Sequence, residues 1–88
     1  MSELKIIGNR SAAMQFNGFG KVGGAHVANL WIRDIKSKES MFYVVKRDTI
    51  LFFQLSKKIK SGASYEDITG ALMTEYADKV YRVSFGRL

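Results

Sequence analysis

The stretch from Gly23 to Ile35 contains the only tryptophan of the chain, Trp31, and an arginine two residues later, Arg33. After its two glycines, this stretch alternates in polarity, as is typical of a strand whose successive side chains point to opposite faces. The opposite face to Trp31 would be small and apolar and would suit a core; it carries Ala28, Leu30 and Ile32. The face of Trp31 and Arg33 would also carry Val27 and Asn29.

An indole ring beside a fixed positive charge suits a nucleic-acid base and its phosphate, because the base can stack on the ring while the cation contacts the backbone. The alternative is that Trp31 is simply a core residue. The alternation favours the first interpretation, because it places the indole opposite the apolar face. We therefore expect Trp31 to face a ligand.

The composition favours a polyanionic partner. The 88 residues include 14 Lys and Arg and 8 Asp and Glu, which gives a formal net charge of +6, and such a field attracts nucleic acid or an anionic surface. Cysteine is absent, which excludes disulfides and thiol chemistry. The single histidine, His26, is better interpreted as a surface residue than as a zinc ligand. We expect no enzymatic activity, no metal and no cofactor, because no paired carboxylates or Ser/His/Asp set is evident.

The length indicates one domain, residues 1–88, with one small core. No apolar stretch approaches the ~20 residues of a membrane span. Residues 1–4 lack the charged-then-apolar pattern of a signal peptide. We therefore expect a cytoplasmic protein.

The start of the chain is expected to be β-rich. Residues 4–7 favour a strand that ends at the turn-prone pair Gly8-Asn9, and we interpret residues 12–16 as the continuation of that strand after an irregularity. Asn17-Gly18 is the strongest hairpin signal in the chain. Residues 80–85 alternate between apolar and polar side chains, which predicts another strand near the end of the chain.

A glycine-rich segment follows the expected hairpin. Gly18, Gly20 and Gly23 fit the letters of the GxGxxG dinucleotide fingerprint. That fingerprint requires a helix to begin at the glycines, whereas a β-type stretch follows here. We interpret the segment as a hairpin loop that carries Phe19 and Lys21.

The middle of the chain predicts a loop, a strand and a helix. Residues 36–40 form a polar, basic loop, and residues 41–46 are rich in β-branched and aromatic types. In that strand, Phe42 and Val44 share one face, and the other face carries Met41, Tyr43 and Val45. A helix capped by Asp48 or Thr49 and stopped at Gly62 is indicated by an apolar repeat at Leu51, Leu55 and Ile59.

Residues 64–77 fit two structures. Ser64 and Asp67 match a capping box, with Ile68, Leu72 and Tyr76 at helical spacing. The same segment also fits a strand, whose period of two would place five residues on one face: Ile68, Gly70, Leu72, Thr74 and Tyr76. The periodicity alone leaves this choice open.

The succession of these segments is similar to that of a known family. The similar segments are an opening strand ending in Gly8-Asn9, the Gly-Gly-x-x-Val-Ala-Asn pattern of residues 23–29, Val44-Val45 followed by a helix ending Lys57-Lys58-Ile59-Lys60-Ser61-Gly62, and residues 68–81. In this order, the chain resembles bacterial single-stranded DNA-binding proteins. The resemblance implies an OB-fold, a mainly β, five-stranded Greek-key barrel with one α-helix between strands three and four. It also implies that the ambiguous segment is a strand from about Ile68.

The sequence departs from that family at the base-stacking aromatic residues. The family's tryptophan at the start of strand three falls near Met41, and its phenylalanine at the end of that strand falls near Arg47. We assign Trp31 and Tyr43 as the stacking platforms instead, because the alternation of their strands is expected to place both on the face that binds the bases. The chain ends at Gly86-Arg87-Leu88 without the acidic tail of that family, so we expect a minimal version such as phages and plasmids carry, or a tail-less primosomal relative.

Basic side chains are assigned to the phosphates of a bound strand. This set comprises Arg33, Arg47, Lys21, Lys36 and Lys38, with Arg10 and Lys46 as weaker candidates. Lys46 is a weaker candidate because the alternation of its strand is expected to place it on the same face as core residues.

The expected function is sequence-non-specific binding of single-stranded DNA in replication, recombination or repair. Two alternatives stay open. One is a small protein-interaction module, such as a phage inhibitor of a host enzyme or a primosome adaptor. The other is an RNA-specific binder, since stacking does not discriminate between sugars. The resemblance also implies a homodimer or homotetramer, without a membrane partner.

Overall fold

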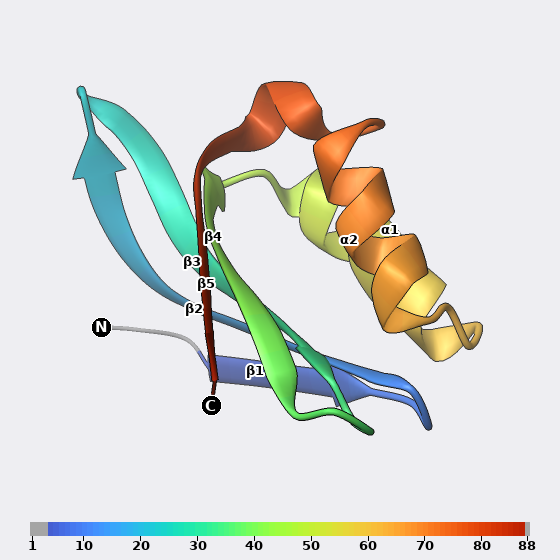
Figure 1. Ribbon diagram of the computed structural model, residues 1–88. Coiled ribbons are helices and arrows are strands. Elements are labelled where there is room, and N and C mark those ends of the chain that lie inside the picture. The colour runs from blue at the N-terminus through green and yellow to red at the C-terminus, as the bar shows by residue number, and fades with distance from the viewer. Residues whose placement is uncertain (1–3, 88) are drawn as a thin grey trace.

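The computed structural model describes residues 4–87 and, within this range, all side chains except those of residues 4, 5, 18, 19 and 87. Figure 1 shows the elements in chain order. They are β1 (Leu4–Gly8), β2 (Ala12–Val22), β3 (Ala25–Asp34), β4 (Glu39–Lys46), α1 (Thr49–Lys60), α2 (Tyr65–Met73), the short 3-10 helix η1 (Ala77–Lys79) and β5 (Val80–Arg87).

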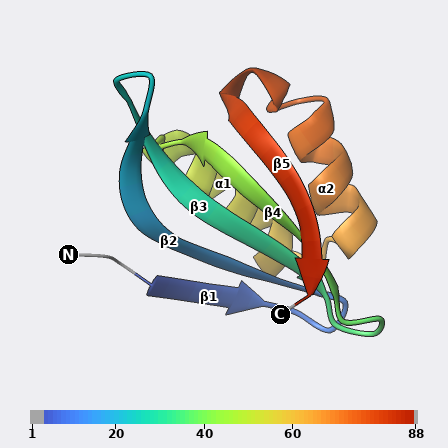
Figure 2. The same cartoon turned by 60° about the vertical axis from the view of Figure 1, so that its left-hand side comes forward.

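The strands form one antiparallel sheet in the order β1-β2-β3-β4-β5, so each strand pairs with its neighbour in the sequence. Both helices lie behind one face of this sheet, and the other face is turned toward the viewer in Figure 2. α1 packs against β1 and β2, whereas α2 packs against β3. The core is the layer between the helices and the sheet.

A mainly β fold is confirmed, but the strand order and the helix placement differ from the Greek-key barrel that the resemblance implied. Both helices lie between β4 and β5, whereas one helix between strands three and four was expected. Residues 4–16, which we interpreted as a single interrupted strand, form the two paired strands β1 and β2.

The side chain of Asn9 explains why the chain reverses between β1 and β2. Its Oδ1 accepts hydrogen bonds from the backbone N–H groups of Ser11 at 2.7 Å and Ala12 at 2.9 Å. Its Nδ2 donates to the carbonyl oxygens of Ile59 at 2.8 Å and Ala63 at 2.9 Å. This one amide therefore builds the turn and also joins it to the end of α1.

The hairpin between β2 and β3 turns at Gly23-Gly24, so the predicted turn at Asn17-Gly18 is wrong. Gly23 has φ of 55° and Gly24 has φ of 85°, and two successive positive φ angles are what a two-residue hairpin turn needs. Asn17 pairs with Asn29 inside the ladder, and the register shifts between Asn17 and Gly20. The Asn-Gly pair therefore lies at a bulge rather than at the turn.

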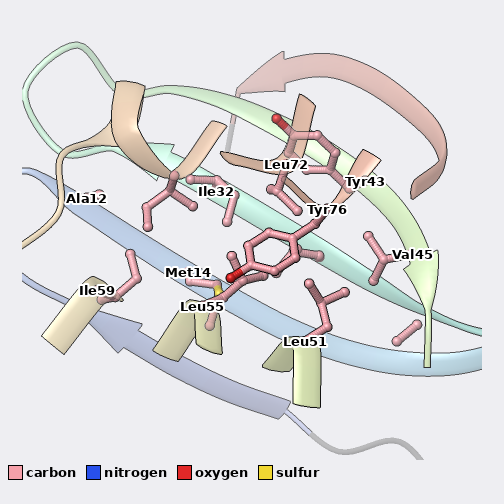
Figure 3. Close-up of a cluster of buried hydrophobic side chains, with 13 residues drawn as sticks. Ala12, Met14, Ile32, Tyr43, Val45, Leu51, Leu55, Ile59, Leu72 and Tyr76 are labelled. Atoms are coloured by element: carbon pink, nitrogen blue, oxygen red, sulfur yellow. The ribbon is translucent and has the colours of Figure 1, made fainter. Parts of the chain in front are cut away.

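The alternation predicted for β3 is confirmed. Its apolar face is sealed under the helices, with relative exposures of 1% or less for Ala28, Leu30 and Ile32. Figure 3 shows the surrounding core, in which side chains from the sheet meet the buried stripes of both helices. The aromatic rings of Phe16 on β2 and Phe52 on α1 extend this contact, with centroids 4.9 Å apart.

Tyr43 lies in the same core with 0% exposure, so its assignment as a stacking platform is wrong. Its partner on β3 is Leu30, and directly opposed residues of an antiparallel pair share a face. The Tyr43 hydroxyl has no hydrogen-bond partner among the described residues. Burial raises the pKa of Tyr43 to about 12.

Helix α1 confirms the predicted cap, apolar repeat and stop. The Asp48 carboxylate accepts from the backbone N–H groups of Ile50 at 2.9 Å and Leu51 at 3.3 Å, which satisfies free donors of the first turn. The chain leaves the helix through Gly62, at φ of 97°. Lys79 pairs with Asp48 at 2.8 Å, and the hydrogen bond from Lys79 is the main reason why the pKa of Asp48 is lowered.

The segment that the resemblance assigned as a strand from Ile68 is helix α2, so that assignment is wrong. Ser64 Oγ accepts from the N–H of Asp67, and the Asp67 carboxylate accepts from the N–H of Ser64, both at 3.1 Å. This capping box fixes the first turn. Ile68 and Leu72, about one helical turn apart, are fully buried on α2.

Candidate functional site

The face of the sheet turned away from the helices, here called the open face, is defined by the strand register. Opposed residues share a face, so rows of side chains run across the five strands. The central row is Ile6, Gln15, Trp31, Phe42 and Ser84. The rows beside it are Asn17, Asn29, Val44 and Arg82 on one side and Ala13, Arg33, Ser40 and Gly86 on the other. The open face therefore mixes aromatic, amide and cationic side chains.

An aromatic pair occupies the centre of the open face. The rings of Trp31 and Phe42 have centroids 4.7 Å apart and planes inclined by 54°, and both side chains are partly exposed. The indole reaches across β4 to Gly86 on β5, where an added Cβ would lie 3.7 Å from two of its ring carbons. Trp31 is thus fixed by packing without belonging to the buried core cluster.

Among the residues whose side chains are described, every charged residue on the open face is a cation: Arg33, Lys46 and Arg82. Asp34 and Glu39 have the parity of the helix-covered face, and both carboxylates add to the effect of burial in raising the pKa of Tyr65 on α2. The other described acidic residues lie on the helical segment, at Asp48, Glu66, Asp67, Glu75 and Asp78. The open face is therefore the electropositive side of the sheet.

Arg33 lies next to a shallow hollow in the open face. The hollow has a volume of about 120 Å³ and is lined by Ile6, Ala13, Met14, Gln15, Trp31 and Arg33. The Arg33 Nε is buried and has no hydrogen-bond partner among the described residues. A buried guanidinium nitrogen without a partner is costly, so an acceptor that entered the hollow would find an unused donor.

The structure brings Trp31 and Arg33 together on one face, two residues apart on β3, as the alternation predicted. The aromatic partner of Trp31 is Phe42, which the sequence analysis had left without a role. A signal for Phe42 exists in the sequence. Its face of β4 ends in the polar residues Ser40 and Lys46, whereas the face of Tyr43 is apolar from Met41 to Val45 and polar only at Glu39.

Three of the assigned cations lie in turns at the Arg33 end of the open face. Arg10 is in the β1–β2 turn, and Lys36 and Lys38 are in the β3–β4 turn; all three are exposed. The two turns are adjacent, because Ile35 N–H donates to the Ser11 carbonyl oxygen at 3.0 Å.

The other assigned cations lie at the opposite end of the open face. Arg47 is exposed and follows β4, and its N–H donates to the His26 carbonyl oxygen at 3.1 Å. The bulge in β2 pairs Lys21 with His26, which gives Lys21 the parity of the helix-covered face. Lys46 pairs with Val27 and lies on the open face, so its expected core parity is wrong. Arg82, which no sequence argument selected, lies between this end and the aromatic pair.

The described residues also bear on metal binding and on membrane insertion. No group of three His, Cys, Asp or Glu that could hold a metal ion occurs in the described part of the chain. His26 is exposed on the β2–β3 hairpin. None of the helices described for residues 4–87 is long and apolar enough to cross a membrane.

Together, the open-face cations follow the direction of β3. Lys46 and Arg82 precede the aromatic pair, and Arg33 and the turn lysines follow it. From Val27 to Arg33 the strand advances about 20 Å at ~3.4 Å per residue. Comparisons of this chain with protein-family models, with curated proteins and with solved structures found no match.

Proposed function

We propose that the open face binds single-stranded DNA without sequence specificity, along the direction of β3. Trp31 and Phe42 are the stacking platforms, and Arg33, Lys46 and Arg82 contact the phosphates. The observation that carries the proposal is the partly exposed Trp31–Phe42 pair on a face whose described charges are all positive. The proposal depends on this face and not on an OB-fold topology.

The aromatic pair supports binding to unpaired bases. A base in a duplex has both faces covered by its neighbours, whereas an unpaired base can stack on an aromatic ring, which contributes about 1–3 kcal/mol per base. Because every base has a π face, such contacts tolerate any sequence. The tilt of 54° between the two rings means that the two platforms would receive successive bases at different angles rather than as one flat stack.

The charge pattern supports a backbone that runs parallel to β3. The cations lie before and after the aromatic pair, so a strand whose bases stack at the centre has its phosphates near positive charge on both sides. Each phosphate that a cation neutralises releases counterions. The slope of log affinity against log salt concentration should therefore be about −0.7 for each phosphate contact with a single strand. The choice of DNA over RNA comes from the resemblance to bacterial single-stranded DNA-binding proteins.

The fluorescence of the single tryptophan tests the proposal directly. Wild-type protein is titrated with oligo-dT, oligo-rU and duplex DNA of equal length at several salt concentrations. We expect oligo-dT to quench Trp31 with a steep salt dependence, and duplex DNA to have little effect. Phe42→Ala keeps the reporter and should weaken oligo-dT binding by about 1–3 kcal/mol.

Phe53→Ala is the matched control, because Phe53 lies on α1 with 65% exposure and faces away from the sheet. It should leave the titration unchanged. Equal quenching by oligo-rU would assign the face to single strands of either sugar, and stronger quenching by oligo-rU would favour an RNA binder. No response to any strand would contradict the proposal and favour a protein-interaction module.

A further inference from the structure

Strand β5 is one of the two edge strands of the described sheet. It pairs only with β4 in the described sheet, so the backbone N–H and C=O groups on its other side have no strand partner. Val80 and Val83 of β5 pack against the core, and α2 lies beside β5 on the helix-covered side of the sheet, as Figure 2 shows. The outer backbone edge of β5 is nevertheless available to another strand.

Two aromatic residues of β5 are exposed. Phe85 is 63% exposed although it pairs with Met41 and has the parity of the helix-covered face. Tyr81 is 47% exposed and is the unpaired residue at the register shift, between Arg82 and Val80. Met73 at the end of α2 is also exposed, at 58%. Beside Tyr81, a groove of about 250 Å³ lies between α2 and β5, lined by Leu72, Met73, Ala77, Val80, Tyr81, Arg82 and Val83.

We propose that β5 pairs antiparallel with β5 of a second copy of this chain, centred on Val83. This inference is independent of nucleic-acid binding. A long edge strand with exposed aromatic residues and free backbone groups is a template for another strand, and a two-fold axis makes such an interface self-complementary.

The side chains of β5 select both the partner and the register. Because opposed residues must share a face, the pairing can only centre on a residue. Centring on Arg82 would oppose two like charges, which is unfavourable. Centring on Val83 places Arg82 opposite the partner's Ser84 and brings the partner's Phe85 beside Tyr81 at the register shift, at both ends of the interface. The same short sequence is therefore complementary to itself in this register.

The groove adds an anchor to the strand pairing. In the register centred on Val83, the partner's Phe85 lies beside Tyr81, which lines the groove. An exposed phenylalanine that enters a groove lined by Leu72 and Met73 is the kind of buried aromatic anchor that dominates interfaces. Symmetry repeats the contact, so each copy supplies one anchor and one groove.

The pairing also fixes the relation between the two open faces. A two-fold axis perpendicular to the sheet keeps both open faces on the same side of one continuous sheet. The two Trp31–Phe42 pairs would then point in the same direction, with Arg82 of each copy near the junction. The helices of both copies would lie together on the other side.

Single cysteines test the register, because the chain contains none. Val83→Cys places two sulfur atoms across the two-fold axis, at a Cα separation of about 4.5–5.5 Å, within the range of a disulfide. We expect this variant to form a covalent dimer on mild oxidation. Ser84→Cys is the matched control: its copies are diagonal neighbours about 7–8 Å apart and should crosslink much more slowly.

Native mass measurement of the unlinked protein tests the interface itself. We expect a dimer for the wild type, a monomer for Phe85→Arg, and a dimer for Phe53→Arg, whose aromatic residue is equally exposed on α1. A monomeric wild type at micromolar concentration would overturn the proposal, as would a dimeric, folded Phe85→Arg. If circular dichroism shows that Phe85→Arg is unfolded, the crosslinking of Val83→Cys and Ser84→Cys tests the proposal instead. Equal crosslinking of these two variants would overturn the proposed register. None of these measurements contains nucleic acid, so their outcome is separate from that of the proposed function.

Discussion

The two faces of the sheet use neighbouring aromatic residues of β4 in opposite ways. Tyr43, the more polar ring, is fully buried and leaves its hydroxyl without a partner among the described residues. Phe42, the less polar ring, lies on the open face, partly exposed against Trp31. Hydrophobicity alone would favour the reverse arrangement. Strand register and helix cover, rather than residue type, therefore decide which aromatic residues are available to a ligand.

The largest effect should separate Leu30 from its neighbour Trp31. Leu30→Ala opens a cavity in the sealed core and should cost about 2–5 kcal/mol of unfolding free energy, measured by urea denaturation. Trp31→Ala should cost less stability because the indole is partly exposed, yet it should lose binding of labelled oligo-dT, measured by fluorescence anisotropy. If both variants lose similar stability and the folded Trp31→Ala still binds normally, the distinction between the faces fails.

A smaller effect should separate the cations of the two faces. Arg82→Gln removes one phosphate contact from the open face, so the slope of log affinity against log salt should become shallower by ~0.7. Lys57→Gln on α1 makes the same change in net charge on the other side of the sheet. Equal changes in slope for the two variants would mean that only overall charge matters, which would contradict a localised site.

Tyr43→Phe should change the stability of the fold and leave oligo-dT binding unchanged. Removal of a buried hydroxyl without a partner should be neutral or stabilise the fold by up to ~1 kcal/mol. The pKa of Tyr43 is raised to about 12, so the folded state keeps the neutral phenol while the unfolded chain ionises near its ordinary pKa of 10. The contribution of the neutral Tyr43 phenol to the free energy of unfolding is therefore fully present below pH 10 and is lost as the pH rises toward about 12. The variant should therefore lose less stability in that window, as alkaline denaturation curves would show; a larger loss would contradict the burial argument.

The smallest effect concerns the ion pair of Asp48 with Lys79 on the helical side. The pKa of Asp48 is lowered mainly by the hydrogen bond from Lys79, so its contribution to stability is present above the ordinary carboxyl pKa and disappears as the pH falls through the lowered value. Asp48→Asn should therefore be less stable than the wild type at neutral pH, and the two denaturation midpoints should converge in acid. A constant difference across this range would exclude an ionic contribution.

Features that depend on local chemistry could be predicted from the amino-acid sequence. The Asp48 cap, the apolar repeat of α1 and the glycine stop follow from backbone groups within one turn of the residues concerned, and the alternation of β3 follows from the strand period. Trp31 and Arg33 could therefore be placed on one face correctly. For residues 64–77 the local signal was also present, since the capping box at Ser64 indicated the helix that the resemblance overruled.

Features that depend on which strands pair with each other became known only from the three-dimensional fold. Both faces of β4 contain apolar residues, so Phe42 or Tyr43 could have faced the core until Leu30 fixed the register. Arg82 joined the open face only because β5 pairs with β4, across the two intervening helices. Such pairings are set by burial of the whole sheet against the helices, and a one-residue slip reverses every face; no local pattern within a single strand contains that information.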